Sequence, residues 1–399
     1  MKPIIRFRQY NKEWCPFKLN TILVPSNEKN TKGLYSKNDV LSVSGEAGIV
    51  NQIAFQGRSF AGASVLNYGV VNTNDIVYTK SPLRNNPYGI IKTNNGPSGI
   101  VSTLYAIYNC CEESCPQFVD TYFTSSSRTN NYLRPLVRKG AKNDMKVSSE
   151  GALQGNVIFP YKDEQIEIAS YFRTLDAKLQ ASAKKVDSLK KLKSASLVAM
   201  FPQNGESKPK VRFKGFEGEW STNNLGSIFA ERIESNENGE MLSVTMNNGI
   251  IRSSDNGRFD NSNSDKSKYK VVKIGDIAYN SMRMWQGASG VSQYEGIVSP
   301  AYTVVTPSVD VDTDFFGYLF KTDDVIRLFK LNSQGLTSDN WNLKYPAFSR
   351  ICVSYPKSKE EQQAIATFFR SLDRKIALET ARLEKLKQIK LACLDKMFV

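Results

Sequence analysis

The chain contains one long segment twice. Residues 162–201 and 359–398 align without a gap, and 17 of the 40 aligned positions are identical. The best-matched part runs from Glu164-Gln165 to Leu175-Asp176, and the same residues recur 197 positions later. A repeat of almost 200 residues is too long for a solenoid, whose units are ~20–50 residues. We therefore expect two similar halves related by a pseudo-two-fold axis.

Shorter matches lie ahead of each copy. Arg6-Phe7 and Trp14 correspond to Arg212-Phe213 and Trp220, whereas the stretches between such matches share almost nothing. Short β-branched and aromatic runs, separated by turn clusters, predict two mixed α/β (α+β) domains in tandem, each followed by a long helix. Shorter helices are expected around 116–124 and 315–332. The expected divisions are a first domain at 1–158, its helix at 159–201, a linker at 202–211, a second domain at 212–356 and its helix at 357–399.

Both repeated segments are expected to be continuous helices, because neither glycine nor proline occurs from 163 to 199 or from 359 onward. Apolar residues follow a heptad pattern in both copies. In the first copy they are Leu175, Leu179, Val186 and Leu189, and in the second Leu372, Ile376, Leu383 and Leu386. Such helices can be solvated arms or halves of a homodimeric coiled coil. Two copies in one chain favour an intramolecular antiparallel coiled coil.

Composition and charge indicate a soluble, folded protein with a polyanionic partner. The 399 residues are 40% hydrophobic and 23% charged, which suits two domains with cores of their own. There is no run of ~18 apolar residues and no secretory signal, and the six cysteines do not suggest a disulfide scaffold. We expect a cytoplasmic protein with no membrane partner. The net charge of +14 favours a nucleic acid as partner, although the second domain is nearly neutral.

Residues needed for several kinds of catalysis are missing. The chain has no histidine, which removes Ser-His-Asp and Cys-His systems and histidine metal sites. Cys110, Cys111 and Cys115 lack the usual spacing of zinc ligands, which favours idle or buried thiols over a metal site. No phosphate-binding Gly-x4-Gly-Lys-Ser/Thr loop occurs, and Asn86-Pro87-Tyr88 lacks the second proline of the Asn-Pro-Pro-Tyr motif of adenine methyltransferases. We expect no catalytic residue, no metal and no cofactor bound by this chain.

Polar segments at comparable places in the two halves are candidate DNA-contacting loops. Arginine suits the O6/N7 edge of guanine, asparagine and glutamine suit the N6/N7 edge of adenine, and serine or threonine serves either. Each segment can equally be an ordinary polar surface loop. The candidates are Lys80, Arg84, Asn85, Asn86, Arg128, Asn130 and Asn131 in the first half, and Arg283, Trp285, Gln286, Ser338 and Asn340 in the second.

Three features together carry a family resemblance. They are the repeated Glu-Gln-x2-Ile-Ala-x-Phe/Tyr-Phe-Arg-x-Leu-Asp opening, the Leu-Lys helix that ends in Met-Phe, and the Arg-Phe-x6-Trp entry to each domain. With these features the whole chain resembles the specificity (S) subunit of type I restriction-modification systems. The resemblance implies two target recognition domains that bind double-stranded DNA. It also implies two methyltransferase (M) subunits that use S-adenosylmethionine, and optionally two restriction/translocase (R) subunits that use ATP and Mg.

The expected function is that of a non-catalytic DNA-specificity subunit. Each domain would read one half of a split, asymmetric target, and the coiled coil would set the spacer and dock the M subunits. Three alternatives remain: a stand-alone pseudo-dimeric sequence-specific DNA-binding regulator, a structural coiled-coil protein with a basic surface, and an enzyme subunit of unrecognised chemistry. Tyr171-Phe172 and Phe368-Phe369, at the helix starts, are either anchors into the domains or docking surface for M.

Overall fold

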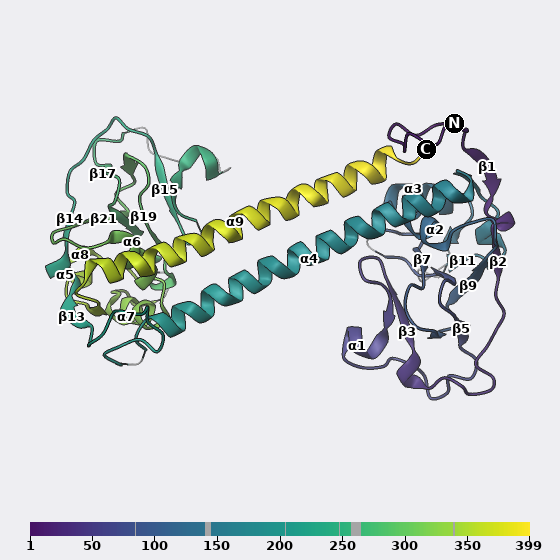
Figure 1. Ribbon diagram of the computed structural model, residues 1–399, viewed down its shortest axis with the longest axis horizontal. Helices are drawn as coiled ribbons and strands as arrows, with labels where there is room; N and C mark the ends of the chain where they lie inside the picture. Colours follow the sequence, from purple (N-terminus) through teal and green to yellow (C-terminus); the bar gives the residue numbers. More distant parts are fainter. Residues whose placement is uncertain (84, 140–144, 204, 247, 257–264, 338–339) are drawn as a thin grey trace. The chain divides into compact units, whose positions relative to one another are not determined.

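The structure is a computed structural model of the 399-residue chain. It describes every residue except 84, 140–144, 204, 247, 257–264 and 338–339. The chain divides into two compact units (Figure 1). Unit 1 comprises Met1–Ala183 together with Ala381–Val399, and unit 2 is Lys184–Thr380. Each unit therefore contains one globular domain, the start of one long helix and the end of the other.

The two repeats form the two long helices, as the sequence predicts. Helix α4 spans Lys162–Met200 and α9 spans Lys359–Lys396. Each begins with two carboxylates in its first turn, which is favourable beside the positive end of the helix dipole. In the described part of the chain, no helix is long and apolar enough to cross a membrane.

The helices run antiparallel within unit 1. Asp176 of α4 forms an ion pair with Lys390 of α9 at 2.5 Å. Five residues earlier on α4, the Tyr171 hydroxyl lies 3.4 Å from the Cys393 sulfur, which is three residues later on α9. Moving toward the start of α4 therefore means moving toward the end of α9, so the two helices run in opposite directions.

Unit 2 repeats this arrangement with the equivalent residues. Lys193 of α4 pairs with Asp373 of α9 at 2.6 Å, and Lys185 pairs with Glu379 at 2.9 Å. Lys193 and Asp373 occupy the repeat positions of Lys390 and Asp176, so the same ion pair forms in both units. The antiparallel coiled coil that the heptads favour is therefore present.

Unit 1 has a four-stranded antiparallel sheet in the order β2-β9-β6-β7, with two-stranded pairs beside it. The register aligns Ile76 of β6 with Tyr108 of β9 and with Thr93 of β7, so β6 is an inner strand. In chain order the elements before α4 are β1 (Cys15–Lys18), β2 (Leu23–Pro25), β3 (Leu41–Ser44), β4 (Gly48–Asn51), α1 (Gln52–Gln56), β5 (Gly69–Val71), β6 (Ile76–Thr79), β7 (Ile91–Thr93), β8 (Gly99–Val101), β9 (Tyr105–Cys110), α2 (Pro116–Tyr122), α3 (Ser126–Leu133), β10 (Arg138–Lys139), β11 (Met145–Lys146) and β12 (Asn156–Phe159).

Unit 2 has the same sheet, in the order β14-β21-β18-β19. Ile277 of β18 aligns with Val305 of β21 and Val291 of β19, which makes β18 the counterpart of β6. In chain order the elements before α9 are β13 (Ser221–Asn224), α5 (Leu225–Ile228), β14 (Phe229–Glu231), β15 (Leu242–Thr245), β16 (Gly249–Arg252), β17 (Lys270–Val272), β18 (Ile277–Asn280), the 3-10 turn η6 (Met284–Gln286), β19 (Ser289–Val291), β20 (Gly296–Val298), β21 (Tyr302–Pro307), α6 (Thr313–Leu319), α7 (Asp323–Asn332), α8 (Tyr345–Phe348) and β22 (Cys352–Tyr355).

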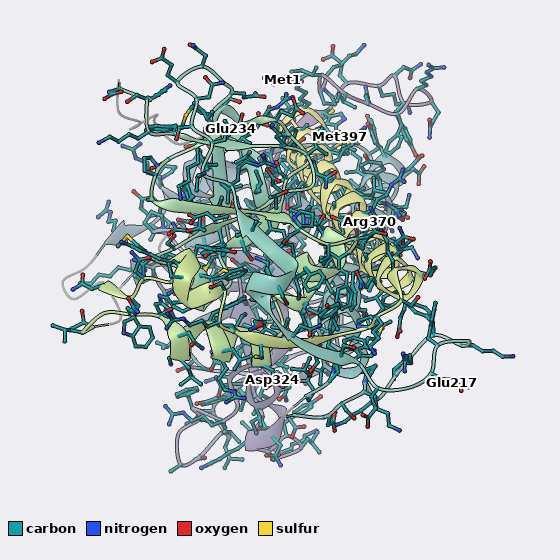
Figure 2. The ribbon with its side chains drawn as sticks, turned by 90° about the vertical axis from the view of Figure 1, so that its left-hand side faces the viewer. Met1, Glu217, Glu234, Asp324, Arg370 and Met397 are labelled. Atoms are coloured by element: carbon teal, nitrogen blue, oxygen red, sulfur yellow. The ribbon has the colours of Figure 1, made fainter. Side chains whose placement is uncertain are left out.

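Aromatic rings hold the helix ends in the core of unit 1. The Phe398 ring, just beyond α9, lies 5.7 Å from Phe118, 5.9 Å from Phe172 and 6.2 Å from Trp14, measured between centroids. We call these four residues the unit 1 aromatic cluster. Both chain ends belong to this unit, and Met1 and Met397 are labelled in Figure 2.

Unit 2 has a matching cluster. The Phe201 ring lies 5.5 Å from Phe315, 5.9 Å from Phe369 and 6.0 Å from Trp220. Phe172 of unit 1 and Phe369 of unit 2 are almost fully buried, so the second aromatic of each repeated pair is a core anchor. Burial of these rings, whose centroids lie 5.5–6.2 Å apart, contributes strongly to cohesion, because large rings bury ~150–250 Å² each.

Each unit also has a buried bidentate ion pair at the start of its helix. Arg6 donates to both carboxylate oxygens of Glu164, through Nε and Nη2, each at 2.7 Å. Arg212 donates to Glu361 in the same way, at 2.6 and 2.8 Å. The repeated Arg-Phe entry therefore locks each domain to its own helix, since bidentate pairing fixes the relative orientation of the two groups.

Two expectations about helices were wrong. The segment from Arg128 to Tyr132, expected to be a loop, belongs to α3, because Ser125 caps its start and the buried Thr129, Tyr132 and Leu133 recur at helical spacing. The single helix expected at 315–332 is two helices, α6 and α7, because the chain turns between them at residues 320–322.

Candidate nucleic-acid interface

Hydrogen bonds hold the two ends of the β6–β7 connection of unit 1 together. Thr79 donates its N–H to the Ile90 carbonyl at 2.9 Å, and the Tyr78 hydroxyl donates to the Tyr88 carbonyl at 2.7 Å. Gly89 has φ +91°, and a Cβ there would lie 2.0 Å from the Thr79 carbonyl oxygen. Glycine is therefore required at that position.

The structure brings four first-half candidates to this loop. Lys80 is partly buried, its Nζ lies 3.5 Å from the Ser149 hydroxyl, and burial lowers the pKa of its ammonium. Asn130 of α3 donates through Nδ2 to the Asn85 carbonyl at 3.0 Å, which places α3 against the loop. The Oδ1 atoms of Asn86 and Asn130 are buried and have no hydrogen-bond partner within the described residues.

Arg128, also a candidate, lies at a different place in unit 1. Its guanidinium donates to the Tyr122 carbonyl at 2.9 Å and to the Leu394 carbonyl at 3.0 Å, and stacks 4.6 Å from the Phe398 ring centroid. Arg128 therefore ties the end of α9 to the domain. Asn131, three residues further along α3, is exposed to solvent.

The equivalent β18–β19 connection of unit 2 contains the η6 turn. Met284 points inward and is fully buried, whereas Arg283 and Gln286 are exposed. Gly287 ends the turn in the left-handed region, at φ +79°, and donates its N–H to the Met284 carbonyl at 2.8 Å. Three second-half candidates, Arg283, Trp285 and Gln286, are thus presented by one short turn.

A tryptophan pair borders this turn. The Trp285 and Trp341 rings meet edge to face at 5.2 Å, and the Lys330 ammonium lies 5.5 Å from the Trp341 centroid. Asn340 is exposed next to Trp341. Aromatic faces beside an exposed cation are suited to stacking and to phosphate attraction. Two other candidates, Arg84 and Ser338, lie outside the described residues.

A polar cavity of about 350 Å³ opens at the base of the same turn. The Ser281 and Thr303 hydroxyls, 2.8 Å apart, form part of its wall, as do Lys344 and Asn342. The Asn342 Oδ1 is buried and, within the described residues, has no hydrogen-bond partner. The second domain therefore offers donors and acceptors around the turn as well as on it.

The thiols show no sign of special reactivity. All six cysteines are free, and burial raises the pKa of Cys110 to about 12, which keeps the thiol protonated at neutral pH. Within the described residues, no group of three or more His, Cys, Asp or Glu side chains could hold a metal ion.

Sequence reasoning missed Lys330 and Lys321, and it did not predict that Trp341, in the polar segment at 337–341, packs against Trp285. Lys330 and Trp341 lie on or after α7 and are brought to η6 only by tertiary packing. One signal was available, because the chain has only four tryptophans and two of them meet here. Nothing in the sequence distinguishes Lys321 from the other lysines. It donates to three backbone carbonyls around the turn.

The comparisons agree with this architecture. Residues 218–388 match the family model described as type I restriction modification DNA specificity domain. The structure of the type I restriction-modification S subunit from M. genitalium is 15% identical, with a TM-score of 0.58 over 100% of this chain and 99% of that one. Because the identity is low, this match shows the fold.

Two further solved structures also match at 15% identity. One is the HsdS subunit from Thermoanaerobacter tengcongensis, with a TM-score of 0.46 and 98% of each chain covered. The other comes from work on complex assembly and conformational transition of the type I R-M system, with a TM-score of 0.48 over 97% of this chain and 98% of that one. No curated protein matches the sequence.

Proposed function

We propose that this chain is a specificity subunit of the type I restriction-modification family and that it reads a split and asymmetric DNA sequence with its two globular domains. The domain family is one of DNA recognition, and it is non-catalytic. The chain would accordingly choose the site, while other subunits carry out the chemistry. Residues 1–158 would read one half of the target and residues 212–356 the other.

One observation carries this proposal: the two units share a framework but differ in their loops. The sheet order, the aromatic cluster and the Arg–Glu pair recur in both units. The connections after β6 and β18 contain different residues, with Lys80 in one at the place of Ser281 in the other. A shared frame with unlike loops is what two readers of unlike half-sites require.

We assign base contacts and phosphate contacts to different side chains. Phosphate contacts position a protein on DNA, and base-edge contacts supply its specificity. We assign base contacts to the loop residues Asn85, Arg283 and Gln286, and phosphate contacts to exposed lysines of the net +14 chain. Arg128 is left out of the proposed interface, because the chain's own carbonyls and rings engage its guanidinium.

We further propose that the coiled coil sets the number of unread base pairs between the half-sites. The partners would be two M subunits, which bring S-adenosylmethionine, and optionally two R subunits, which bring ATP and Mg. No glycine or proline interrupts α4 or α9, which supports a spacer role for the coiled coil.

Sequencing of methylated adenines tests the proposal. DNA from cells that express this chain with its M partner should contain one split methylated motif, and deletion of the chain should abolish it. Exchange of residues 212–356 for the same domain of a related protein should change one half of the motif and leave the other half and the spacing intact. A change in both halves would contradict two independent readers, and specific DNA binding without any M partner would favour a stand-alone regulator.

A further inference from the structure

Lys321 lies in the short connection between α6 and α7. Its ammonium donates to the carbonyls of Gly287, Ser289 at 2.8 Å and Met246 at 3.3 Å. Gly287 ends the η6 turn, and Ser289 begins β19. Met246 follows β15, in the turn that leads to β16. One side chain therefore bonds three carbonyls in two backbone segments, at 246 and at 287–289, that are distant from each other in sequence.

The η6 turn rests directly on this region. A Cβ added to Gly287 would lie 3.3 Å from Ile326 Cδ1 and 3.8 Å from Lys321 Cδ, so the backbone packs against both side chains. A Cβ added to Gly290 would lie 2.7 Å from the Gly249 Cα, which places the β15–β16 turn equally close to β19. The ammonium is at the junction of these close contacts.

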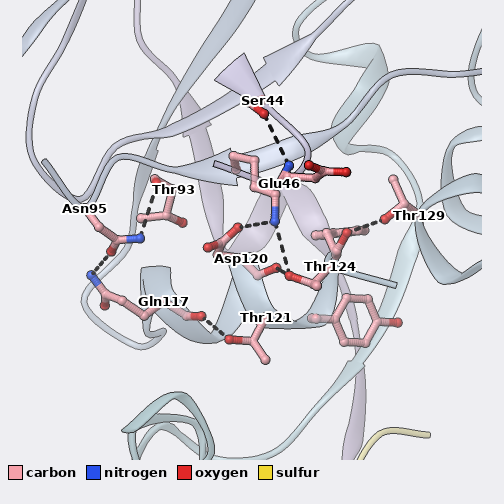
Figure 3. A network of polar contacts seen from close by, with 12 residues as sticks. Ser44, Glu46, Thr93, Asn95, Gln117, Asp120, Thr121, Thr124 and Thr129 are labelled. Atoms are coloured by element: carbon pink, nitrogen blue, oxygen red, sulfur yellow. Dashed lines mark hydrogen bonds and ion pairs between the residues drawn. The ribbon is translucent and has the colours of Figure 1, made fainter. Parts of the chain in front are cut away.

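Unit 1 also has a lysine between its edge strand and the following helices, but that lysine comes from the strand. Lys92 of β7 forms an ion pair with Asp120 at 3.2 Å and donates to the Thr124 hydroxyl at 3.2 Å. Figure 3 shows Asp120 and Thr124 in this polar network. The sheet register makes Gly290 the unit 2 counterpart of Lys92. The repeat offset of 197 residues makes Gly317 the counterpart of Asp120, and Lys321 the counterpart of Thr124.

The lysines of the two units therefore have different partners. In unit 1 its main partner is the carboxylate of α2, whereas in unit 2 its partners are backbone carbonyls, two of which belong to the η6 loop and the start of β19. Burial lowers the pKa of Lys321 to about 8, and the charge of Lys193 adds to this effect. The ammonium is still the main form at pH 7, with its donors directed at the carbonyls.

We propose that Lys321 is a positioning residue for DNA recognition by unit 2. By binding the carbonyls of Met246, Gly287 and Ser289, it fixes the η6 turn in the shape that presents Arg283 and Gln286. The proposal rests on the proposed function, because it assumes that this turn reads DNA. A lysine that served stability alone would affect the whole unit and would have no special effect on the turn.

Hydrogen exchange of the full-length protein tests the local part without any DNA. In Lys321→Met, which keeps an unbranched apolar stem and removes the donors, the amides of Arg283, Gln286 and Gly287 should exchange at least about tenfold faster. Amides of the β18–β21 pair, such as Val304, should be unchanged. Unchanged exchange at the turn would overturn the proposal, and so would an equal acceleration throughout unit 2.

Methylated-adenine sequencing tests the specificity part. K321M should relax or shift at least one position of the second half-site, with the first half-site unchanged. The matched control is Lys273→Met, which removes one charge from the same unit at an exposed lysine paired with Glu234. Even as a phosphate contact, this lysine should leave the motif intact when it is replaced, because phosphate contacts do not read the sequence. Faster exchange at the turn with an unaltered second half-site would overturn Lys321 as a determinant of specificity.

Additional variants, and the behaviour of the wild-type chain, distinguish a failure of this proposal from a failure to fold or a failure of the proposed function. If K321M does not accumulate as folded protein, Lys321→Gln replaces it, because an amide supplies two donors without charge and should give an intermediate exchange rate. Restoration of the wild-type motif by Lys321→Arg would support the donor role. If the wild-type chain directs no methylation, the proposed function fails, and the exchange measurement still decides whether Lys321 holds the turn.

Discussion

Ile5 donates its backbone N–H to the carbonyl of Lys396 at 2.9 Å, so the N-terminal segment is bonded to the last turn of α9. The end of the linker makes the same bond in unit 2, where Val211 donates to Ala199 at 2.8 Å. The N-terminus therefore takes the place in unit 1 that the end of the linker takes in unit 2.

A circular permutant should therefore fold. The Met1 carbonyl accepts from Trp14 as the Ser207 carbonyl accepts from Trp220, so a copy of residues 203–206 is the natural bridge from Val399 to Met1. With new ends between Gly205 and Glu206, we expect a melting temperature within a few degrees of the parent and the same methylated motif. An insoluble permutant, or one with another motif, would contradict the equivalence of the two junctions.

Loss of the buried ion pair should destabilise unit 1. Glu164→Ala leaves the guanidinium of Arg6 without its carboxylate, and the two side chains are only 3% and 12% exposed. Breaking such a pair costs about 3–5 kcal/mol, measurable by urea denaturation. The control is Glu167→Ala, one turn away, which removes an exposed bond to Gln9. Equal losses in the two variants would show that burial does not strengthen the Arg6 pair.

Phe398→Ala should loosen unit 1 by removing the central ring of its aromatic cluster. Truncation of a buried phenylalanine costs about 3–5 kcal/mol, and amides at the start of α4 should lose protection against hydrogen exchange. The control is Leu391→Ala near the end of α9, because the Leu391 side chain is 67% exposed. A cost below about 1 kcal/mol for F398A would contradict its place in the core.

Arg128→Met should lower stability without changing the target sequence. The variant keeps the apolar stem but loses the bonds to the carbonyls of Tyr122 and Leu394. Hydrogen bonds from a charged group are worth about 1.5–3 kcal/mol each, so the melting temperature should fall by several degrees. A changed first half-site at unchanged stability would return Arg128 to the DNA-contacting set.

Arg283→Ala should relax one position of the second half-site. Its side chain is exposed on η6, and a base-reading arginine contributes about 1–3 kcal/mol of discrimination at one position. Sequencing of methylated adenines at several expression levels distinguishes a base contact from a phosphate contact. If methylation weakens uniformly across all sites, Arg283 is a phosphate contact.

The repeat allowed much of the fold to be predicted. The recurrence of Trp14 and Phe172 as Trp220 and Phe369 implied two similar units, and the heptads around Leu175 and Leu372 implied the coiled coil. Helix α3 was missed because its polar residues, Asn130 and Asn131, have weak helix propensity, and the cap at Ser125 and the buried face outweigh that preference.

The candidate site could be predicted only in outline. Loop position followed from the strand before it, so Asn85 and Arg283 were found on the equivalent connections. Which side chains turn inward depends on tertiary contacts that have no sequence period. Arg128 folds back onto the last turn of α9, and Lys321 reaches a loop more than thirty residues earlier in the chain.

The division of the chain has a consequence for its synthesis. Unit 2 is one continuous stretch, whereas unit 1 needs its last nineteen residues, Ala381–Val399, to complete the packing around Phe398. More than 200 residues separate Phe172 from Phe398, and ribosomes add about 5–20 residues per second. The first domain therefore leaves the ribosome roughly 10–45 s before its aromatic cluster can close. The domain that is made first is the one that finishes last, and a chain truncated near its end would lose the N-terminal unit's core.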